Sequence, residues 1–325
     1  MDSRIYRKGL LLLVLCAGFA CAGAGRGLAF DRKTSLSLSR YIMAGIYEKQ
    51  GEFDKAIQEY KKALKADEKN AVIHISLAAA YIRNNQIPEA ITSINRSSEL
   101  DPDAVEPHAV LALLYFSQDK IDEAGQAYEK ALQNAAKIEP RNIRVYKSLG
   151  ILYLQRKQYQ QAESAFTVVV GLAPNDHEAH FYLANILDEQ KKRPEAIQQL
   201  KKVLELKPDY HPALNYLGYV YVEENKNLAE AEKMIKRALE LDTRNGAYID
   251  SLGWLYFKQG RTQDAIRELE RAISLLEDPV IFDHLGDAYF KVEDIEKARQ
   301  NWEKSLALDP DQEEVKKKIE KLKPR

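Results

Sequence analysis

The chain has 325 residues, of which 45% are hydrophobic and 30% charged, as is ordinary for a soluble, folded protein. A formal net charge of -1 gives no general attraction for nucleic acid, so we expect no nucleic-acid partner. Eighteen Tyr against only 15 Gly favour helices that carry aromatic side chains over a large sheet with many tight turns.

Residues 1–20 predict an export signal, because Arg4, Arg7 and Lys8 precede an apolar run about half as long as a membrane-spanning helix. The stretch resembles a bacterial lipoprotein signal with its lipid on Cys21, although the residues before that Cys depart from the usual motif. Cleavage after an ordinary "ACA" site and a retained anchor remain alternatives. We expect an exported protein of the cell envelope, held by lipid to a membrane that faces the periplasm, with residues 21–36 as a linker.

Both cysteines, Cys16 and Cys21, belong to this leader and its cleavage site. The folded body therefore has no thiol for a disulfide, a redox centre or a thiolate metal site.

A pattern of the form L-[GA]-x-x-Y recurs eight times along the body of the chain. The copies start at Met43, Leu77, Leu111, Leu149, Leu183, Leu217, Leu252 and Leu285, with spacings of 34, 34, 38, 34, 34, 35 and 33 residues. Each is followed by an Ala at a matching place, at Ala56, Ala90, Ala124, Ala162, Ala196, Ala231, Ala265 and Ala298. A period of about 34 residues predicts a helical solenoid.

Each copy predicts two amphipathic helices, because apolar residues recur at i, i+3, i+4 and i+7. Gly51 and Gly260 lie between the two helices of their copies, where a glycine can adopt a positive φ. Five copies close with a proline, which cannot continue a helix. The longer third copy has about four extra residues, which we place at the end of its second helix, and the sixth has one extra residue near "ENKNLAE".

With its Leu-Gly, Tyr, Ala and Pro places, the chain resembles the tetratricopeptide repeat (TPR) family over residues 37–312. This resemblance implies an all-α, right-handed solenoid of about eight helix-turn-helix repeats. Residues 313–325 predict a capping helix and tail, with Val315, Ile319 and Leu322 on one face of an otherwise charged helix.

The resemblance also implies that the first helix of each repeat lines a concave groove. In the later repeats its groove-facing places are aromatic, amide and acidic, and we predict that they bind a partner: Phe181, Tyr182, Asn185, Asn215, Tyr216, Tyr219, Asp250, Trp254, Phe257, Asp283 and Asp287. The alternative is that these rings pack against neighbouring helices and that the Asp residues pair locally with Arg or Lys. In the first repeats the same places carry apolar residues such as Leu38, Ile42 and Val72.

The body contains no recognisable catalytic motif, so we expect no enzyme and no cofactor. His177 and His180 are spaced i, i+3, but His180 occupies a framework place, so we expect no metal site. Charged runs such as "KKK" at Lys316 to Lys318 predict solvated helix faces.

The sequence therefore predicts a non-catalytic scaffold or adaptor that binds a protein or peptide segment in its concave groove. The resemblance to exported members of the family implies an assembly factor of an envelope complex such as a pilus, a secretion channel or a polysaccharide exporter. The alternative is an exported protein that binds a glycan or small molecule, because sugars also stack on Trp and Tyr rings.

Overall fold

The computed structural model describes residues 32–322, and every regular element in that range is an α-helix. In chain order the helices are α2 (Arg32–Lys49), α3 (Phe53–Ala66), α4 (Ala71–Arg83), α5 (Ile87–Leu100), α6 (Glu106–Ser117), α7 (Ile121–Ile138), α8 (Ile143–Gln155), α9 (Tyr159–Leu172), α10 (His177–Glu189), α11 (Arg193–Leu206), α12 (His211–Glu223), α13 (Leu228–Leu241), α14 (Gly246–Lys258), α15 (Thr262–Ile273), α16 (Pro279–Lys291), α17 (Ile295–Leu308) and α18 (Glu313–Glu320). The predicted all-α class is confirmed.

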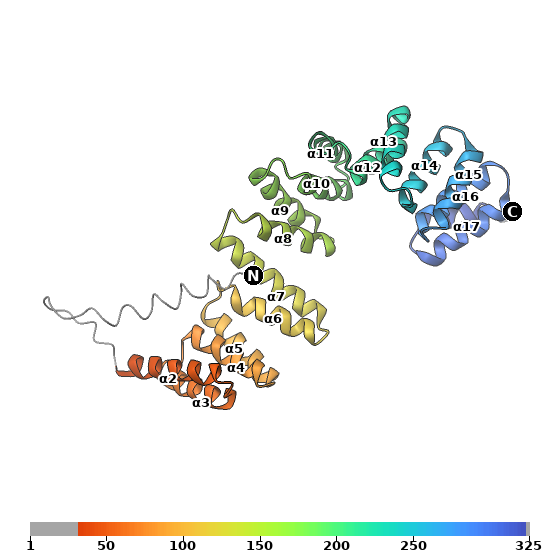
Figure 1. The fold of residues 1–325 in the computed structure, drawn as a ribbon. Helices are drawn as coiled ribbons and strands as arrows, with labels where there is room; N and C mark the ends of the chain where they lie inside the picture. Colours follow the sequence, from red (N-terminus) through yellow and green to blue (C-terminus); the bar gives the residue numbers. More distant parts are fainter. Residues whose placement is uncertain (1–31, 323–325) are drawn as a thin grey trace. The chain divides into compact units, whose positions relative to one another are not determined.

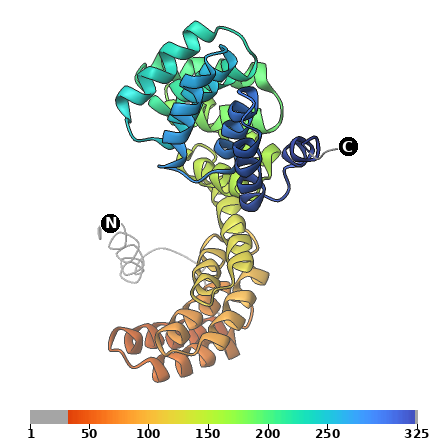
Figure 2. The same cartoon turned by 90° about the vertical axis from the view of Figure 1, so that its right-hand side faces the viewer.

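The helices follow one another as pairs, from α2 and α3 to α16 and α17, with α18 left over at the end (Figure 1). Only a few residues separate the two helices of a pair, as between Arg83 and Ile87, so the second helix turns back along the first (Figure 2). These eight pairs coincide with the eight repeats predicted from the sequence.

Each turn inside a pair contains a residue in the left-handed region of backbone space. Gly51 and Gly260 adopt φ of 77° and 78°, as predicted. The other turns use residues with side chains at this place: Asn85, Asp119, Lys157, Lys191, Asn225 and Glu293. The turn geometry is thus shared by all eight repeats, although only two of them supply the residue that adopts it without steric cost.

Side-chain caps fix where several first helices begin. The side chains of Asn70, Asp176 and Asn245 accept hydrogen bonds from backbone N–H groups three residues on. Asn142 and Asp278 do the same two residues on. Each cap satisfies a backbone donor that the helix itself leaves without a partner.

Small residues allow the two helices of a repeat to approach closely. A Cβ atom added to Gly253 would lie 2.7 Å from Leu269 Cγ, and one added to Gly286 would lie 2.5 Å from Trp302 Cδ1. Glycine at these places is therefore required by packing, which explains the repeated Leu-Gly pair.

The two irregular repeats differ where the sequence predicts it. Helix α7 has 18 residues, whereas the second helices α3, α5 and α9 have 14. In the sixth repeat the additional residue lies in the turn, where both Asn225 and Asn227 have positive φ. The insertions thus change helix or turn length and leave the pairing intact.

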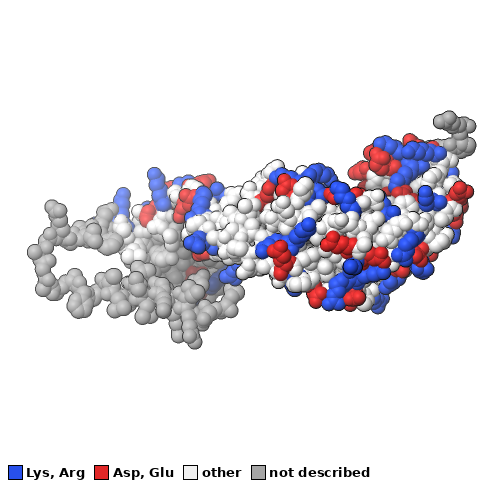
Figure 3. All heavy atoms as spheres, turned by 90° about the horizontal axis from the view of Figure 1, so that it is seen from above, with Lys and Arg blue, Asp and Glu red and all other residues white. Residues whose placement is uncertain are grey.

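The chain groups into two compact units, Met1–Leu111 and Ala112–Arg325, and the boundary falls within α6. Unit 1 has a core around Tyr60, Leu77 and Ile94, each at most 4% exposed. Unit 2 has a larger core that includes Phe166, Leu200, Ile235 and Leu269, all with no exposed surface. Basic and acidic side chains are interspersed on the face shown in Figure 3, consistent with the near-zero net charge.

Candidate functional site

All eleven residues of the predicted binding strip lie on the first helices of four consecutive repeats in unit 2. Helix α10 carries three of them, α12 three, α14 three and α16 two. No contact with a partner is present to test their role, so partner binding by these residues stays a prediction. The structure does show what each side chain contacts within the chain.

On α10 and α12 the rings contact one another. Phe181 meets Tyr216 edge-on, with 6.3 Å between ring centroids, and Tyr182 stacks on Phe166 at 5.0 Å. The Tyr216 hydroxyl donates to Asp188 at 2.8 Å, and burial, reinforced by that carboxylate, raises the pKa of Tyr216. Phe181, Tyr182 and Tyr216 are half-buried, whereas Phe166 has no exposed surface.

Two amides and a phenol complete this part of the strip. Asn185 Nδ2 donates to the backbone oxygen of Phe181 at 2.8 Å, so it is used within its own helix. Asn215 Oδ1 is buried and accepts no hydrogen bond. Burial raises the pKa of Tyr219, and the nearby carboxylates of Glu223 and Asp250 act in the same direction.

Trp254 is part of the core and does not stand free on the surface. It is 7% exposed, lies between the rings of His284 and Phe257, and donates from Nε1 to Glu223 at 2.6 Å. The Lys258 ammonium lies 4.5 Å from its ring centroid. Every part of this indole therefore has an internal contact.

The acidic residues of the strip have internal partners as well. Asp250, 6% exposed, accepts from His284 Nδ1 at 2.9 Å. Asp283 and Asp287 both contact Lys318 of α18, at 2.6 and 2.7 Å. Burial raises the pKa of Asp287, against the opposing effect of Lys318. These internal partners offset part of the negative charge of the strip, since one lysine pairs with both Asp283 and Asp287.

Lys318 also corrects a sequence expectation. The run Lys316 to Lys318 was predicted to be solvated, and Lys316 and Lys317 do pair with Glu313 and Glu314 on the exposed side of α18. Lys318 instead points inward, because it follows Val315 by three residues on the helix face that packs against the core. A signal was present in the sequence: Asp283 and Asp287 are spaced i, i+4 and lie about one repeat before Lys318.

A pocket of about 300 Å³ opens at this end of the strip. Its lining includes the predicted residues Phe257 and Asp287, together with Trp302 and Phe290, whose side chain is 48% exposed. The remaining lining residues are lysines: Lys291, Lys318 and Lys321. The open part of the strip thus combines aromatic surface with positive charge.

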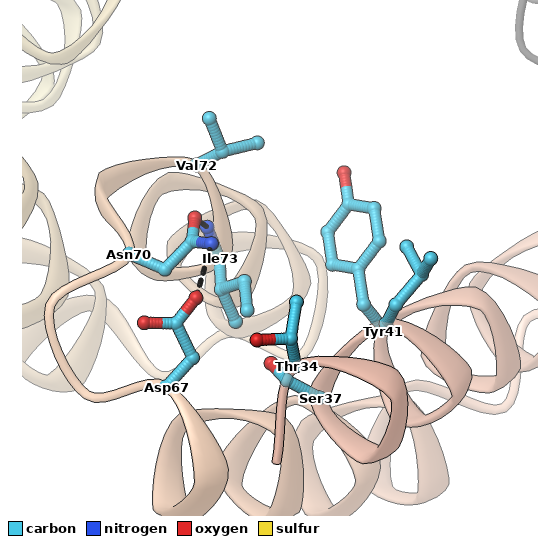
Figure 4. A pocket seen from close by; sticks show the side chains of 8 residues that line it. Thr34, Ser37, Tyr41, Asp67, Asn70, Val72 and Ile73 are labelled. Atoms are coloured by element: carbon cyan, nitrogen blue, oxygen red, sulfur yellow. Dashed lines mark hydrogen bonds between the residues drawn. The ribbon is translucent and has the colours of Figure 1, made fainter. Parts of the chain in front are cut away.

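Unit 1 presents a second opening, between α2 and α4, with a volume of about 320 Å³ (Figure 4). Tyr41 and Val72 border it from the two helices, and Asn70, which donates to Asp67 at 2.8 Å, lies at its end. The apolar side chains here are exposed: Leu38 48%, Ile42 54% and Val72 59%. Within residues 32–322 these three side chains stay exposed, in contrast to Trp254 and Asp250 in unit 2.

The remaining site predictions concern metal and the membrane. His180 is buried, with one ring nitrogen 2.6 Å from Gln199 Oε1 and the other 3.0 Å from the Pro174 oxygen. Within residues 32–322 no cluster of His, Cys, Asp and Glu could hold a metal ion, and no helix is long and apolar enough to cross a membrane. Cys21 and the predicted export signal lie outside the described residues.

Helix pairs repeated at intervals of 33 to 38 residues, each with a left-handed residue in its turn, define the molecule as an all-helical repeat protein. Family models also match the chain as a helical repeat protein. The model described as the cilia and flagella-associated protein 70 C-terminal domain, a TPR model, matches residues 26–216. Tetratricopeptide repeat models match residues 211–245, 246–278 and 281–312. The chain belongs to the tetratricopeptide repeat family.

Curated relatives share only their repeat regions with this chain. The general transcriptional corepressor ssn6 of Schizosaccharomyces pombe is 26% identical over 148 residues, which are 46% of this chain and 13% of that protein. The TPR repeat-containing protein YpiA of Bacillus subtilis is 24% identical over 160 residues, 49% of this chain and 37% of that protein. The match therefore spans a minor part of these relatives.

Solved structures share the fold. A tetratricopeptide repeat protein from Parabacteroides merdae gives a TM-score of 0.55 at 16% identity, covering 77% of this chain and 97% of that one. PilW, described as a type IV pilus biogenesis factor, gives a TM-score of 0.53 at 17% identity, and the match covers 66% of this chain and 98% of PilW.

Proposed function

We propose that the protein is a non-catalytic scaffold that binds a segment of another protein along the inner sides of its first helices. The observation that carries this proposal is the exposed apolar surface of unit 1, where Leu38 and Val72 line an open pocket and Ile42 lies one helical turn after Leu38. Exposed apolar side chains gathered around a groove are a mark of interaction surfaces, because burying them against a partner is favourable.

The second contact region is the pocket at the end of unit 2. Phe257 and Phe290 supply apolar area. Lys291 and Lys321, which have no ion pair with residues 32–322, favour a partner segment with an acidic or carboxylate group beside an apolar side chain. Asp283 and Asp287 attract a basic group less strongly than two free carboxylates would, since both already pair with Lys318.

The finer part of the proposal is that the partner belongs to an assembly of the cell envelope. Its support is the leader sequence, with basic residues before an apolar run and Cys21 after it. PilW is described as a pilus biogenesis factor, but at 17% identity its likeness to this chain concerns the fold. The glycan-binding alternative has lost its main support, because Trp254 is buried and has no free face on which a sugar could stack.

The test is site-specific photo-crosslinking in cells, with the crosslinking residue placed at Leu38 or Ile42 and, as a matched control, at Ile295, an exposed apolar residue on a second helix. We expect one defined protein adduct from the first two positions and none from Ile295. Leu38→Asp with Val72→Asp should abolish the adduct formed at Ile42 and leave thermal unfolding unchanged, because both side chains are exposed. Equal adducts from all three positions would contradict a groove-specific partner.

A further inference from the structure

The outer end of the first repeat, on the side away from α4, combines apolar and basic side chains. Lys33, Leu36, Arg40 and Met43 lie along one stripe of α2, because they are spaced three or four residues apart. Lys62 and Lys65 of α3 complete a groove of about 370 Å³ with the first three of these residues. We call these six residues the N-terminal end face.

One apolar side chain of this face, that of Met43, is exposed at a place that is buried in the other repeats. Met43 is 42% exposed, whereas its counterparts in the other repeats are between 1% and 7% exposed: Leu77, Leu111, Leu149, Leu183, Leu217, Leu252 and Leu285. Leu36 is 48% exposed. At the opposite end of the chain α18 closes the last repeat, with Val315 only 2% exposed. Among residues 32–322 no helix plays this part for the first repeat.

The charges around this apolar centre are mostly positive. Glu59 is the carboxylate of the face, and it contacts both Arg40, at 3.0 Å, and Lys62, at 2.7 Å. Lys33 and Lys65 have no ion-pair partner among residues 32–322. An occupant should therefore offer negative charge next to apolar surface.

Charge argues against a second copy of the chain as that occupant. Two end faces related by a two-fold axis would bring Lys33 and Lys65 toward their own counterparts, and like charges repel. The exposed side of α18 does not complement the face either, because it carries Lys316, Lys317 and Lys321 as well as its glutamates.

We propose that the N-terminal end face docks on a membrane surface that contains anionic phospholipids. Leu36 and Met43 would enter the boundary between headgroups and acyl chains, while the unpaired lysines contact phosphates. Cys21 precedes Arg32 by eleven residues, a spacer of at most about 40 Å. A lipid on Cys21 and the end face could therefore contact the same membrane.

The test uses the full chain carrying Cys21→Ser, which removes any acyl chain, and vesicles of phosphatidylcholine with or without phosphatidylglycerol. Two further substitutions, Lys33→Ala and Lys65→Ala, should weaken binding to the anionic vesicles roughly 30-fold. Each lysine contributes about 1 kcal/mol to binding, and about 1.4 kcal/mol corresponds to a tenfold change in affinity. Binding to pure phosphatidylcholine should not change. The matched control, Lys201→Ala with Lys233→Ala, removes two exposed lysines from unit 2 and should change neither.

A second pair of variants tests the apolar part of the proposal. Leu36→Ser with Met43→Ser should weaken binding to anionic vesicles and leave the salt dependence intact, because the lysines remain. The proposal is overturned if the end-face and control lysine pairs behave alike, or if the chain shows no preference for anionic vesicles. It is also overturned if the serine variants instead abolish a concentration-dependent dimer in sedimentation, since the occupant would then be a second copy.

Discussion

At the scale of single residues, the binding strip shows how a side chain on the groove side of a helix can serve the core. Trp254 and Asp250 lie at places that the repeat pattern leaves variable, yet each is at most 7% exposed. The reason is that the next repeat presents His284, which stacks on Trp254 and donates to Asp250. Side chains from two consecutive repeats thus stack on one another and form hydrogen bonds with one another, in line with the alternative that the strip residues have partners within the chain.

We predict that Trp254→Ala lowers the free energy of unfolding by about 3 kcal/mol or more, because it removes a buried ring and leaves a cavity. Trp254→Phe should cost less, since it keeps the stacking on His284 and loses mainly the bond to Glu223. Urea denaturation measures both. Phe290→Ala is the control, because that ring is 48% exposed and should contribute little stability. Wild-type stability of Trp254→Ala would show that the indole does not pack as described.

The Asp250 and His284 pair also predicts a dependence on pH. Burial lowers the pKa of His284, but the carboxylate of Asp250 and its hydrogen bond outweigh burial, so the pKa lies above its ordinary value of 6.5. Asp283 and Glu223 act in the same direction. A raised histidine pKa means that the folded state binds the proton more tightly than the unfolded state, which stabilises the fold at low pH.

The stability supplied by this pair should therefore be fully present below about pH 6.5 and decline as the pH rises through the raised pKa. Melting temperatures across this range measure it. His284→Gln should remove that part of the pH dependence, whereas His74→Gln, on a helix of unit 1, should leave it unchanged. A slope that survives His284→Gln would assign the dependence to other groups.

At the scale of elements, every turn inside a repeat requires a residue with positive φ, but most repeats have a residue other than glycine at that place. Glu293 adopts φ of 64°, which is sterically costly for a residue with a Cβ atom. We predict that Glu293→Gly raises the free energy of unfolding by about 0.5 kcal/mol, after allowing for the greater freedom of glycine in the unfolded chain. Gly260→Ala, at φ of 78° with no atom within 4 Å of the added Cβ, should lower it by about 1 kcal/mol. Thermal denaturation measures the stability of both variants. If the two substitutions changed the free energy of unfolding in the same direction, the repeats would not share one turn geometry.

Helix pairing makes a second prediction at this scale. Gly253→Ala should destabilise the protein by about 1–3 kcal/mol, because its Cβ would lie 2.7 Å from Leu269 Cγ in a packed interface. Gly171→Ala has nothing within 4 Å of the new Cβ, so it should stabilise α9 by up to about 1 kcal/mol through helix propensity. Urea titrations measure whether each substitution raises or lowers the free energy of unfolding. Equal effects would mean that the Leu-Gly place does not set the helix spacing.

The sequence predicted the elements, but it did not predict the internal partners of the site residues. Helix pairs, the longer α7 and the additional turn residue of the sixth repeat follow from periodicity, which depends only on local spacing. The partners of Asp250, Asp283 and Asp287 depend on which residues of one repeat face those of the next. His284 and Lys318 lie 34 and 35 residues after Asp250 and Asp283, so comparing charges one period apart would have found both pairs. Exposure of Leu38, Ile42 and Met43 depends on which side chains of other helices contact them, and no pattern within one repeat contains that information.

At the scale of the whole molecule, α18 should stabilise only the repeats next to it. Removing residues 313–325 uncovers the site of Val315 and leaves Asp283 and Asp287 without Lys318. We predict faster hydrogen exchange in α16 and α17 and unchanged exchange in α2 to α5, because each repeat of a solenoid contacts its neighbours. Lys316→Ala with Lys317→Ala is the control, since both side chains are on the outer side. Faster exchange along the entire chain would contradict this local coupling.

The short turns within pairs have a consequence for how the protein acquires its structure. Because the contacts of each helix are mainly with its neighbours in the sequence, little chain entropy is lost in forming any one of them, and such low contact order favours rapid folding. Any helix pair could nucleate the process. The N-terminal pairs could therefore fold while the ribosome is still adding the last repeats, so exposed apolar surface would be covered progressively as the chain lengthens.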